Sequence, residues 1–278
     1  LASSSVLAWN DHFPSTLSGE DVGIAEHILS GLTYDRDGLE DGIRLFETID
    51  KWAMENDLAV SERHKWIMDE MLDLNVQRLM IAGTSGNGKS ALIHSILGED
   101  SFDLPTAAAV MYKYGEEENV SEVTDSSIIH LNDDEVEERI TSREWMGGPP
   151  RIIDYRLPSA FLKDNGIAII DTPGFSIANS KTQEVRRYLH MADSLLFVLD
   201  VNDPFSHRER DIVLMIQEQA PDLPIHFLLN KMDLVHNDQE AIRIVDEAWK
   251  KINPYLPNAK IFAHSAHYKG ASQLRDFT

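Results

Sequence analysis

One short segment constrains the fold of this chain more than any other: Gly83-Thr-Ser-Gly-Asn-Gly-Lys-Ser90. Its first and last glycines, its lysine and its serine have the spacing of a phosphate-binding loop. The glycines let successive backbone N–H groups turn toward one anion, and the helix that follows presents the positive end of its dipole. Because such a loop joins a strand to a helix, it predicts an α/β fold with a mainly parallel central sheet and helices on both faces.

The hydrophobic pattern after residue 75 agrees with this fold, because short apolar runs alternate with segments of helical spacing. The acidic stretch 116–146 is expected to hold a strand and a helix that form a surface insert. Elsewhere we expect strands at 76–82, 107–114, 167–171, 194–201, 225–229 and 260–263, and helices at 90–97, 181–191, 206–219 and 238–252.

The residues before 76 have a different texture, with three amphipathic helical patterns that could form a bundle or an arm. These patterns begin near residue 18, cover about 39–52, and begin again near residue 61. The sequence therefore predicts two parts, an α-helical segment at 1–75 and a nucleotide-binding domain at 76–278.

Charge and composition narrow the choice of partners. The 278 residues include 25 Lys and Arg against 47 Asp and Glu, a formal net charge of −22. Phosphate polymers repel such a chain, so we expect no nucleic-acid partner.

The sequence contains no cysteine, which excludes disulfides and zinc-thiolate sites. No apolar run approaches the roughly 20 residues of a membrane span, and the first residues lack a signal-peptide pattern, so we expect a cytoplasmic location.

In a phosphate-binding loop the chemistry assigns a task to each position. Lys89 reaches the β- and γ-phosphates of a nucleoside triphosphate, and the Ser90 hydroxyl coordinates Mg²⁺, the expected cofactor. Ser85 could contact the region of the γ-phosphate. The expected nucleotide-binding residues of this loop are Gly83, Thr84, Ser85, Gly86, Asn87, Gly88, Lys89, Ser90 and Ala91.

A second motif, Asp171-Thr-Pro-Gly174, directly follows the apolar run 167–170. Strand ends in such sheets point at the ligand crevice. Asp171 can hold Mg²⁺ through a water, and the Gly174 N–H can bond the γ-phosphate, so this loop would respond to the presence of that phosphate.

The third motif, Asn230-Lys-Met-Asp233, indicates the base. The Asp233 carboxylate can accept hydrogen bonds from the ring N–H and the amino group of guanine, a pair that adenine does not offer. Asn230 can steady the loop or meet the guanine carbonyl, and the Lys231 stem can lie along the base. A weaker signal, His264-Ser265-Ala266, follows a short apolar run, and its backbone N–H could close on the guanine carbonyl.

A mobile threonine is also needed, with a hydroxyl that ligates Mg²⁺ and a carbonyl that places the attacking water. Thr106 lies between the first helix and the next strand, which is the right place. The expected metal ligands are thus Ser90, Thr106 and Asp171, and the expected catalytic residues are Lys89, Thr106 and Ser85.

With these motifs, Leu104-Pro-Thr106 and the phrase Leu157-Pro-Ser-Ala-Phe-Leu-Lys-Asp-Asn-Gly166 give the chain a family resemblance. Residues 76–278 resemble the GTPase domain of dynamin-like proteins, with bacterial dynamin-like proteins and mitofusins nearest in texture. The resemblance implies GTP hydrolysis with weak basal activity, binding of GTP and GDP, and a homodimer across the nucleotide face. It further implies a neck, to which residues 18–75 could contribute, and membrane remodelling or tethering, with peripheral membrane association through regions outside this chain.

The chain also departs from the family pattern. Ser85 and Gly86 stand where dynamin carries a glutamine and a serine that help to place the water, and Phe175 follows the second motif where a water-activating glutamine could stand. We therefore expect slow turnover by the isolated chain and acceleration by a partner or a second copy. Because the chain ends soon after the fourth motif, we expect a fragment or a member without a trailing stalk.

Two other functions stay open from the sequence. One is a signalling or assembly GTPase of the ribosome-associated kind, against which the acidity of the chain argues. The other is a nucleotide-gated interaction module with little turnover, which the altered phosphate loop permits.

Overall fold

The computed structural model describes residues 36–58, 62–73, 75–97, 109–124, 127–141, 151–174 and 188–265. The chain divides into two compact units, residues 1–60 and 61–278. Helix α3 (Arg36–Glu55) belongs to the first unit, and helix α4 (Glu62–Leu72) belongs to the second, together with the sheet. The functional boundary that we place after residue 75 stays a prediction. No helix in these described stretches is long and apolar enough to cross a bilayer.

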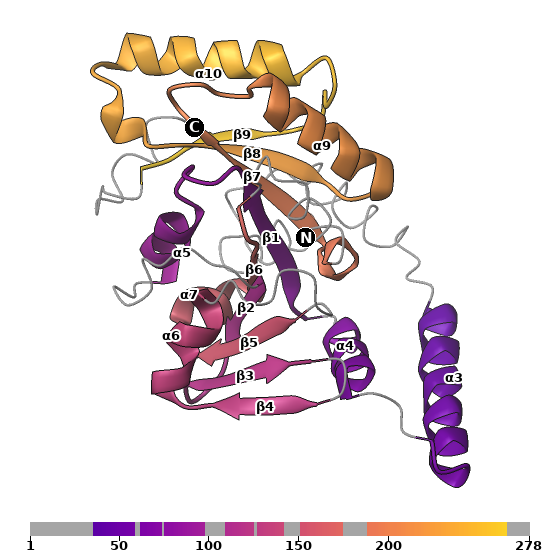
Figure 1. The fold of residues 1–278 in the computed structure, drawn as a ribbon. Helices are drawn as coiled ribbons and strands as arrows, with labels where there is room; N and C mark the ends of the chain where they lie inside the picture. Colours follow the sequence, from indigo (N-terminus) through magenta and orange to yellow (C-terminus); the bar gives the residue numbers. More distant parts are fainter. Residues whose placement is uncertain are drawn as a thin grey trace, which may run out of the picture. The chain divides into compact units, whose positions relative to one another are not determined.

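The second unit is built on one twisted sheet of nine described strands, in the order β4-β3-β5-β2-β6-β1-β7-β8-β9 (Figure 1). Strand β2 runs antiparallel to β6, and β3 runs antiparallel to β4 and β5; the other pairings are parallel. The strands are β1 (Gln77–Gly83), β2 (Ala109–Tyr114), β3 (Asn119–Val123), β4 (Ile128–Leu131), β5 (Ile152–Leu157), β6 (Ile167–Asp171), β7 (Ser194–Asp200), β8 (Ile225–Asn230) and β9 (Ile261–Ala263).

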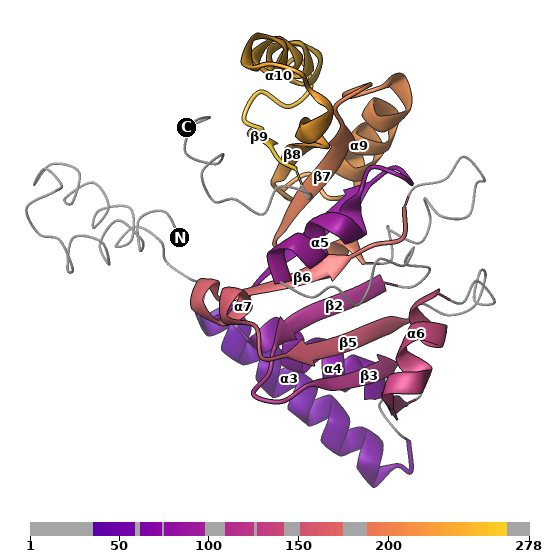
Figure 2. The same ribbon diagram turned by 90° about the vertical axis from the view of Figure 1, so that its left-hand side faces the viewer.

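Helices cover both faces of this sheet (Figures 1 and 2). On β1, Ile81 packs with Leu92 and Ile93 on one face, whereas Met80 and Ala82 belong to the core on the other face, as strand alternation requires. The first face carries α5 (Lys89–Leu97), α6 (Asp133–Thr141) and α7 (Ala160–Asn165); the second carries α4, the 3-10 helix η1 (Leu189–Met191), α9 (His207–Gln219) and α10 (Asp238–Ile252). The predicted α/β fold, with a mainly parallel sheet covered on both faces, is therefore confirmed.

Helix α4 is fastened to the sheet by a buried polar cluster. The Trp66 indole Nε1 donates to Asp154 Oδ2 of β5 at 3.0 Å. The Lys113 ammonium of β2 lies 3.0 Å from the same carboxylate oxygen, bonds Glu70 of α4, and stands 5.5 Å from the centre of the Trp66 ring. These contacts explain why α4 belongs to the second unit.

The stretch 116–146 differs from the expectation. Its described residues hold two strands and a helix, β3, β4 and α6, where one strand and one helix were expected. It also continues the central sheet beyond β5 instead of forming a surface insert, so that part of the expectation is wrong.

Strand β5 and helix α7 were not expected either. Strand β5 ends at Leu157, the first residue of the phrase 157–166, and α7 lies within that phrase, where Ser159 caps its start and Gly166, at φ +57°, ends it. The other expected elements are present within three residues of their expected bounds where they are described. The helical pattern expected from near residue 18 and most of the helix expected at 181–191 lie outside the described residues.

Candidate functional site

The phosphate loop connects β1 to α5, as its sequence predicted. Lys89 is the first residue of α5 and is only 6% exposed. Its Nζ donates to the carbonyl oxygens of Gly83 at 3.1 Å and Thr84 at 3.3 Å. The glycines of the loop have φ values of +152°, +93° and +82° at Gly83, Gly86 and Gly88. The backbone thus curls around the lysine in a conformation that side chains with a Cβ rarely adopt.

The third motif touches the first. Asn230, 2% exposed at the end of β8, donates from Nδ2 to the Asn87 carbonyl at 2.9 Å and to the Gly88 carbonyl at 3.3 Å. A Cβ on Gly88 would lie 2.5 Å from that Nδ2, so this close approach requires glycine. The role of Asn230 in steadying a loop therefore has a geometric basis.

The second motif also lies against the phosphate loop. Strand β6 pairs with β1, and Asp171, 1% exposed, stands opposite Ile81. The Thr172 hydroxyl donates to the Ile81 carbonyl at 2.9 Å. A Cβ on Gly174 would lie 2.9 Å from the Ser85 Cα and 3.0 Å from the Lys89 Nζ. The glycine therefore lets this loop approach the place where a γ-phosphate is expected.

The oxygen donors near these loops suit Mg²⁺. Ser90 is the second residue of α5 and offers a hydroxyl, and Asp171 offers a buried carboxylate. Hydroxyl, carboxylate, phosphate and water oxygens are the ligands that Mg²⁺ prefers. The described residues hold no cluster of three or more His, Cys, Asp or Glu side chains that could bind a metal by themselves. A Mg²⁺ ion at this place would thus need phosphate oxygens as well, and Thr106, the third expected ligand, lies outside the described residues.

The third and fourth motifs meet at the edge where a base would lie. The Ser265 hydroxyl donates to Asp233 Oδ1 at 2.6 Å, and Asp233 is otherwise exposed. The His264 backbone N–H donates to the Leu229 carbonyl at 2.8 Å, and the His264 carbonyl accepts from Met232 N at 3.1 Å. Burial lowers the pKa of His264 below its usual value. The neighbouring residue Ala266 lies outside the described residues.

Asp200 is a residue of this site that the motifs missed. Lys231 has a left-handed backbone, with φ +67°, and its Nζ lies 2.6 Å from Asp200 Oδ2 at the end of β7. Burial by itself would raise the pKa of Asp200, but hydrogen bonds from Lys231 and Asn202 lower it. The pair holds the lysine stem of the third motif in place. The available signal was an acidic residue at the end of a strand that neighbours β8.

Glu209 also reaches the site without belonging to any motif. It lies in the first turn of α9, is 3% exposed, and accepts hydrogen bonds from Thr84 and Asn87 of the phosphate loop. The spacing of Ser206 and Glu209 matches a helix-capping pair, which could have located the start of α9 but not this contact with a loop 122 residues away.

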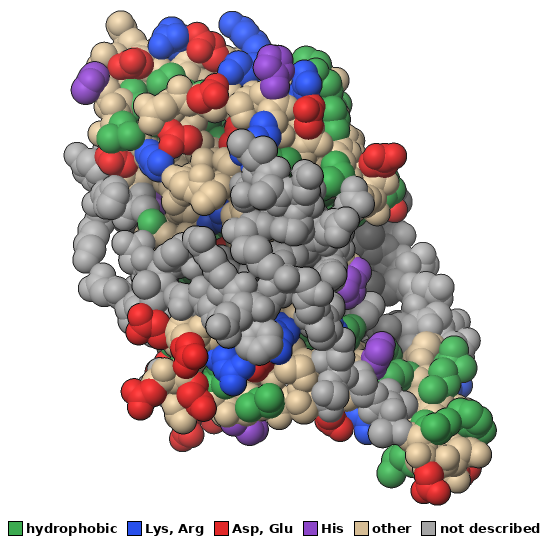
Figure 3. Space-filling model, viewed as in Figure 1, with side chains coloured by type: hydrophobic (Ala, Val, Ile, Leu, Met, Phe, Trp, Pro, Cys, Tyr) green, Lys and Arg blue, Asp and Glu red, His purple; other side chains and the backbone are tan. Residues whose placement is uncertain are grey.

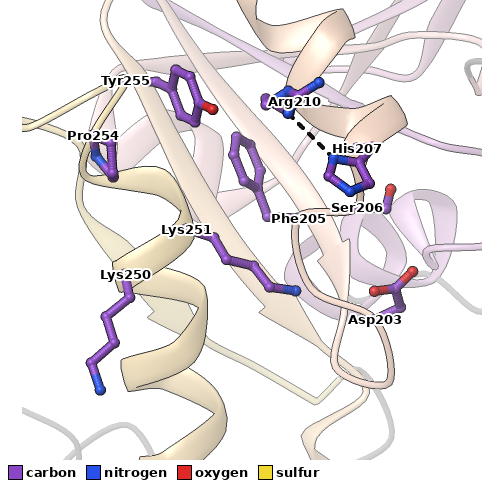
Figure 4. A pocket seen from close by; sticks show the side chains of 9 residues that line it. All are labelled: Asp203, Phe205, Ser206, His207, Arg210, Lys250, Lys251, Pro254 and Tyr255. Atoms are coloured by element: carbon purple, nitrogen blue, oxygen red, sulfur yellow. Dashed lines mark hydrogen bonds between the residues drawn. The ribbon is translucent and has the colours of Figure 1, made fainter.

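A cavity of about 480 Å³ lies between the start of α9 and the end of α10 (Figure 4). Among the described residues that line it, none belongs to the four motifs. Two of its basic side chains are engaged within the protein, because Lys251 donates to the Pro204 carbonyl at 2.9 Å and Arg210 pairs with Asp211 at 2.8 Å. The candidate site is therefore the edge formed by the four motifs.

Comparison with known proteins identifies the family. A sequence model of the dynamin family matches residues 79–232, more than half of the chain, from β1 to the third motif. The chain belongs to the dynamin family. Its fold is thus the α/β fold of P-loop GTPases, and the recognition made from the motifs is confirmed.

Three similar proteins extend beyond the part of their length that matches this chain. A protein of the xynA 3′ region of Caldicellulosiruptor sp. is 27% identical over 84% of this chain and 60% of its own length. A bacterial dynamin-like protein from Nostoc punctiforme is 25% identical over 61% of this chain and 27% of its own length. A solved structure of an oligomerised bacterial dynamin pair, described with the sensing and tethering of membranes, has a TM-score of 0.56 at 16% identity and matches 92% of this chain and 53% of its own. The chain therefore spans less than two thirds of each of these proteins.

Proposed function

We propose that this dynamin-family chain binds GTP and hydrolyses it to GDP and phosphate. The observation that carries the proposal is the contact of all four motifs at one edge of the sheet. Asn230 bonds the backbone of the phosphate loop, Gly174 approaches Ser85 and Lys89, and Ser265 bonds Asp233. Motif residues as far apart in the sequence as Gly83 and Ser265 thereby lie around a single place, as one nucleotide would require.

Each residue has a task in this proposal. The backbone amides of residues 83–91 cradle the phosphates, and the Lys89 ammonium turns from its carbonyl partners to the β- and γ-phosphates. The Gly174 N–H bonds the γ-phosphate. Ser85 contacts the γ-phosphate region, and Thr106 orients the attacking water through its carbonyl.

Magnesium belongs to the same proposal. Ser90, Thr106 and Asp171 are the residues that would hold Mg²⁺, Asp171 through a water. The bound ion would supply charge neutralisation on the phosphate oxygens.

The choice of guanine rests on Asp233. Ser265 fixes one carboxylate oxygen at 2.6 Å, which leaves further acceptor positions of an exposed carboxylate facing outward. Guanine offers two donors there, from N1 and from the amino group, whereas adenine would leave the acceptor unpaired.

The Asp233→Asn variant tests this assignment, with the exposed Asp222→Asn as its matched control. An amide offers one donor and one acceptor, which complements xanthine, whose C2 carries a carbonyl where guanine carries its amino group. We expect GTP affinity to fall by about 100-fold or more and xanthosine triphosphate to bind better than GTP. Unchanged GTP preference in Asp233→Asn, measured by calorimetry, would remove the base assignment.

We further propose that nucleotide-dependent self-association across the nucleotide face accelerates hydrolysis and drives membrane tethering or remodelling. The family supports this proposal, with peripheral membrane contact through regions outside this chain. We propose no nucleic-acid partner, because the chain carries a charge of −22 and acidic side chains gather over α6 on the face in Figure 3.

Turnover per molecule, measured against protein concentration, tests the self-association. It should rise with concentration; a low rate at every concentration would favour the interaction module instead. Co-sedimentation with liposomes or with ribosomes separates the membrane proposal from an assembly GTPase.

A further inference from the structure

We propose that Glu209 is a positioning residue of the nucleotide site. It holds the phosphate loop through the side chains of Thr84 and Asn87 and links the loop to the start of α9. The proposal rests on the proposed function of the phosphate loop. Glu209 itself would not touch the nucleotide, because its carboxylate reaches the loop through side chains and leaves the backbone amides of the loop to face the phosphates.

The two oxygens of the carboxylate serve different partners. Oε1 accepts from the Thr84 hydroxyl at 3.2 Å and from the Asn87 amide at 2.9 Å. Oε2 accepts from the backbone N–H and the hydroxyl of Ser206, both at 2.9 Å. Glu209 is 3% exposed and Asn87 is 6% exposed, so water does not readily replace these bonds. One buried side chain thus joins the loop after β1 to the cap of α9.

Only a carboxylate satisfies both ends. The Asn87 Nδ2 also donates to the Val198 carbonyl at 2.8 Å, which fixes the orientation of that amide with its nitrogen toward Glu209. The Ser206 backbone N–H can only donate as well. Each oxygen therefore faces at least one group that cannot accept. A glutamine would present its oxygen to one end and its NH2 group to the other, so it would leave a donor unpaired, either the buried Asn87 amide at the loop or the half-buried Ser206 N–H at the cap.

The same turn of α9 reaches the surface. Ser206, whose hydroxyl bonds Glu209, also lines the cavity between α9 and α10 (Figure 4). A rearrangement of the phosphate loop on nucleotide binding would therefore change the hydrogen bonds at the first turn of α9. This coupling predicts that nucleotide slows amide hydrogen exchange in that turn.

The loss of a negative charge and the loss of positioning predict opposite effects of Glu209→Gln on nucleotide affinity. Removal of a negative charge near the phosphate site would by itself tighten binding of an anionic nucleotide. Loss of positioning should weaken it, and we expect roughly tenfold weaker binding of GDP and GTP by calorimetry. Glu218→Gln, an exposed change on the same helix, is the matched control and should bind as the wild type does.

Two further variants separate positioning from helix stability. Ser206→Ala removes the cap hydroxyl but leaves the hydrogen bonds that Glu209 accepts from Thr84 and Asn87. It should lower the melting temperature while nucleotide affinity changes less than about twofold. Asn87→Ala should weaken binding as Glu209→Gln does, and the double variant should be little weaker than either single one, because both remove the same link. Nucleotide protection of the first turn of α9 should be lost in Glu209→Gln.

The outcomes distinguish this inference from the proposed function. If the wild-type chain bound no guanine nucleotide, the proposed function would fail. If the wild type bound GTP and Glu209→Gln bound it equally or more tightly, the positioning role would be overturned while the function stood. The positioning role would also be overturned if Ser206→Ala lowered nucleotide affinity as much as Glu209→Gln does. It would be overturned as well if the affinity losses of Glu209→Gln and Asn87→Ala were additive in the double variant.

Discussion

The contact between Asn230 and the phosphate loop can be tested with two glycines of the same loop. Gly86 and Gly88 both have left-handed φ values, +93° and +82°. A Cβ on Gly86 would meet nothing within 4 Å, whereas a Cβ on Gly88 would lie 2.5 Å from the Asn230 Nδ2. Gly86→Ala is thus a control with the same backbone strain and without the clash.

The contacts in the structure set the size of the expected loss in stability for each variant. Backbone strain costs each variant about 1–2 kcal/mol of unfolding free energy. In Gly88→Ala the Asn230 side chain must also move, and it loses its bonds to the carbonyls of Asn87 and Gly88. Two such bonds from a buried amide are worth about 2 kcal/mol together. We therefore expect Gly88→Ala to melt roughly 4–8 °C below Gly86→Ala.

The assay is thermal unfolding of the nucleotide-free protein, which avoids any clash of the new methyl groups with a ligand. Equal melting temperatures for the two variants would show that the hydrogen bonds from Asn230 to the phosphate loop do not stabilise the protein, and the reasoning would fail.

Two other predictions concern the rest of the second unit. Trp66→Phe removes the donor to Asp154 but keeps a ring in the core, so unfolding free energy should fall by about 1.5–3 kcal/mol; the exposed Trp249→Phe should change it little, and equal effects would contradict the buried cluster. Burial lowers the pKa of His264 from its usual 6.5, so below that pH the unfolded state binds more protons. Between pH 7.5 and 5.5 the wild type should therefore lose melting temperature relative to His264→Gln, with no such change above pH 7.5; a relative gain would reverse the sign.

Local chemistry explains what the sequence could predict. A turn of glycines at Gly83 and Gly88 permits few backbone paths, and the residues after strands β6 and β8 must fall at the same edge as that turn. Motif spacing therefore placed Asn230 and Asp171 near the loop without knowledge of the pairing. Helix α10 began and ended as its amphipathic spacing indicated.

Buried polar residues explain why strands β3 and β5 and the contact of Glu209 were not predicted from the sequence. In β3 the polar side chains of Ser121 and Glu122 are buried, and Glu122 pairs there with Arg151, so the alternation that identifies a half-buried strand is lost. Asp154 breaks the apolar run of β5 in the same way, because its partners Trp66 and Lys113 come from other elements. The contact of Glu209 with Asn87 joins distant residues and leaves no periodic trace.

The central claim is a site for guanine nucleotides, and a calorimetric titration of the nucleotide-free protein with GTP, GDP and ATP at equal Mg²⁺ tests it most directly. The account predicts that GTP and GDP bind with affinities at least about 100-fold above that of ATP. Equal affinity for GTP and ATP, or tighter binding of ATP, would contradict it.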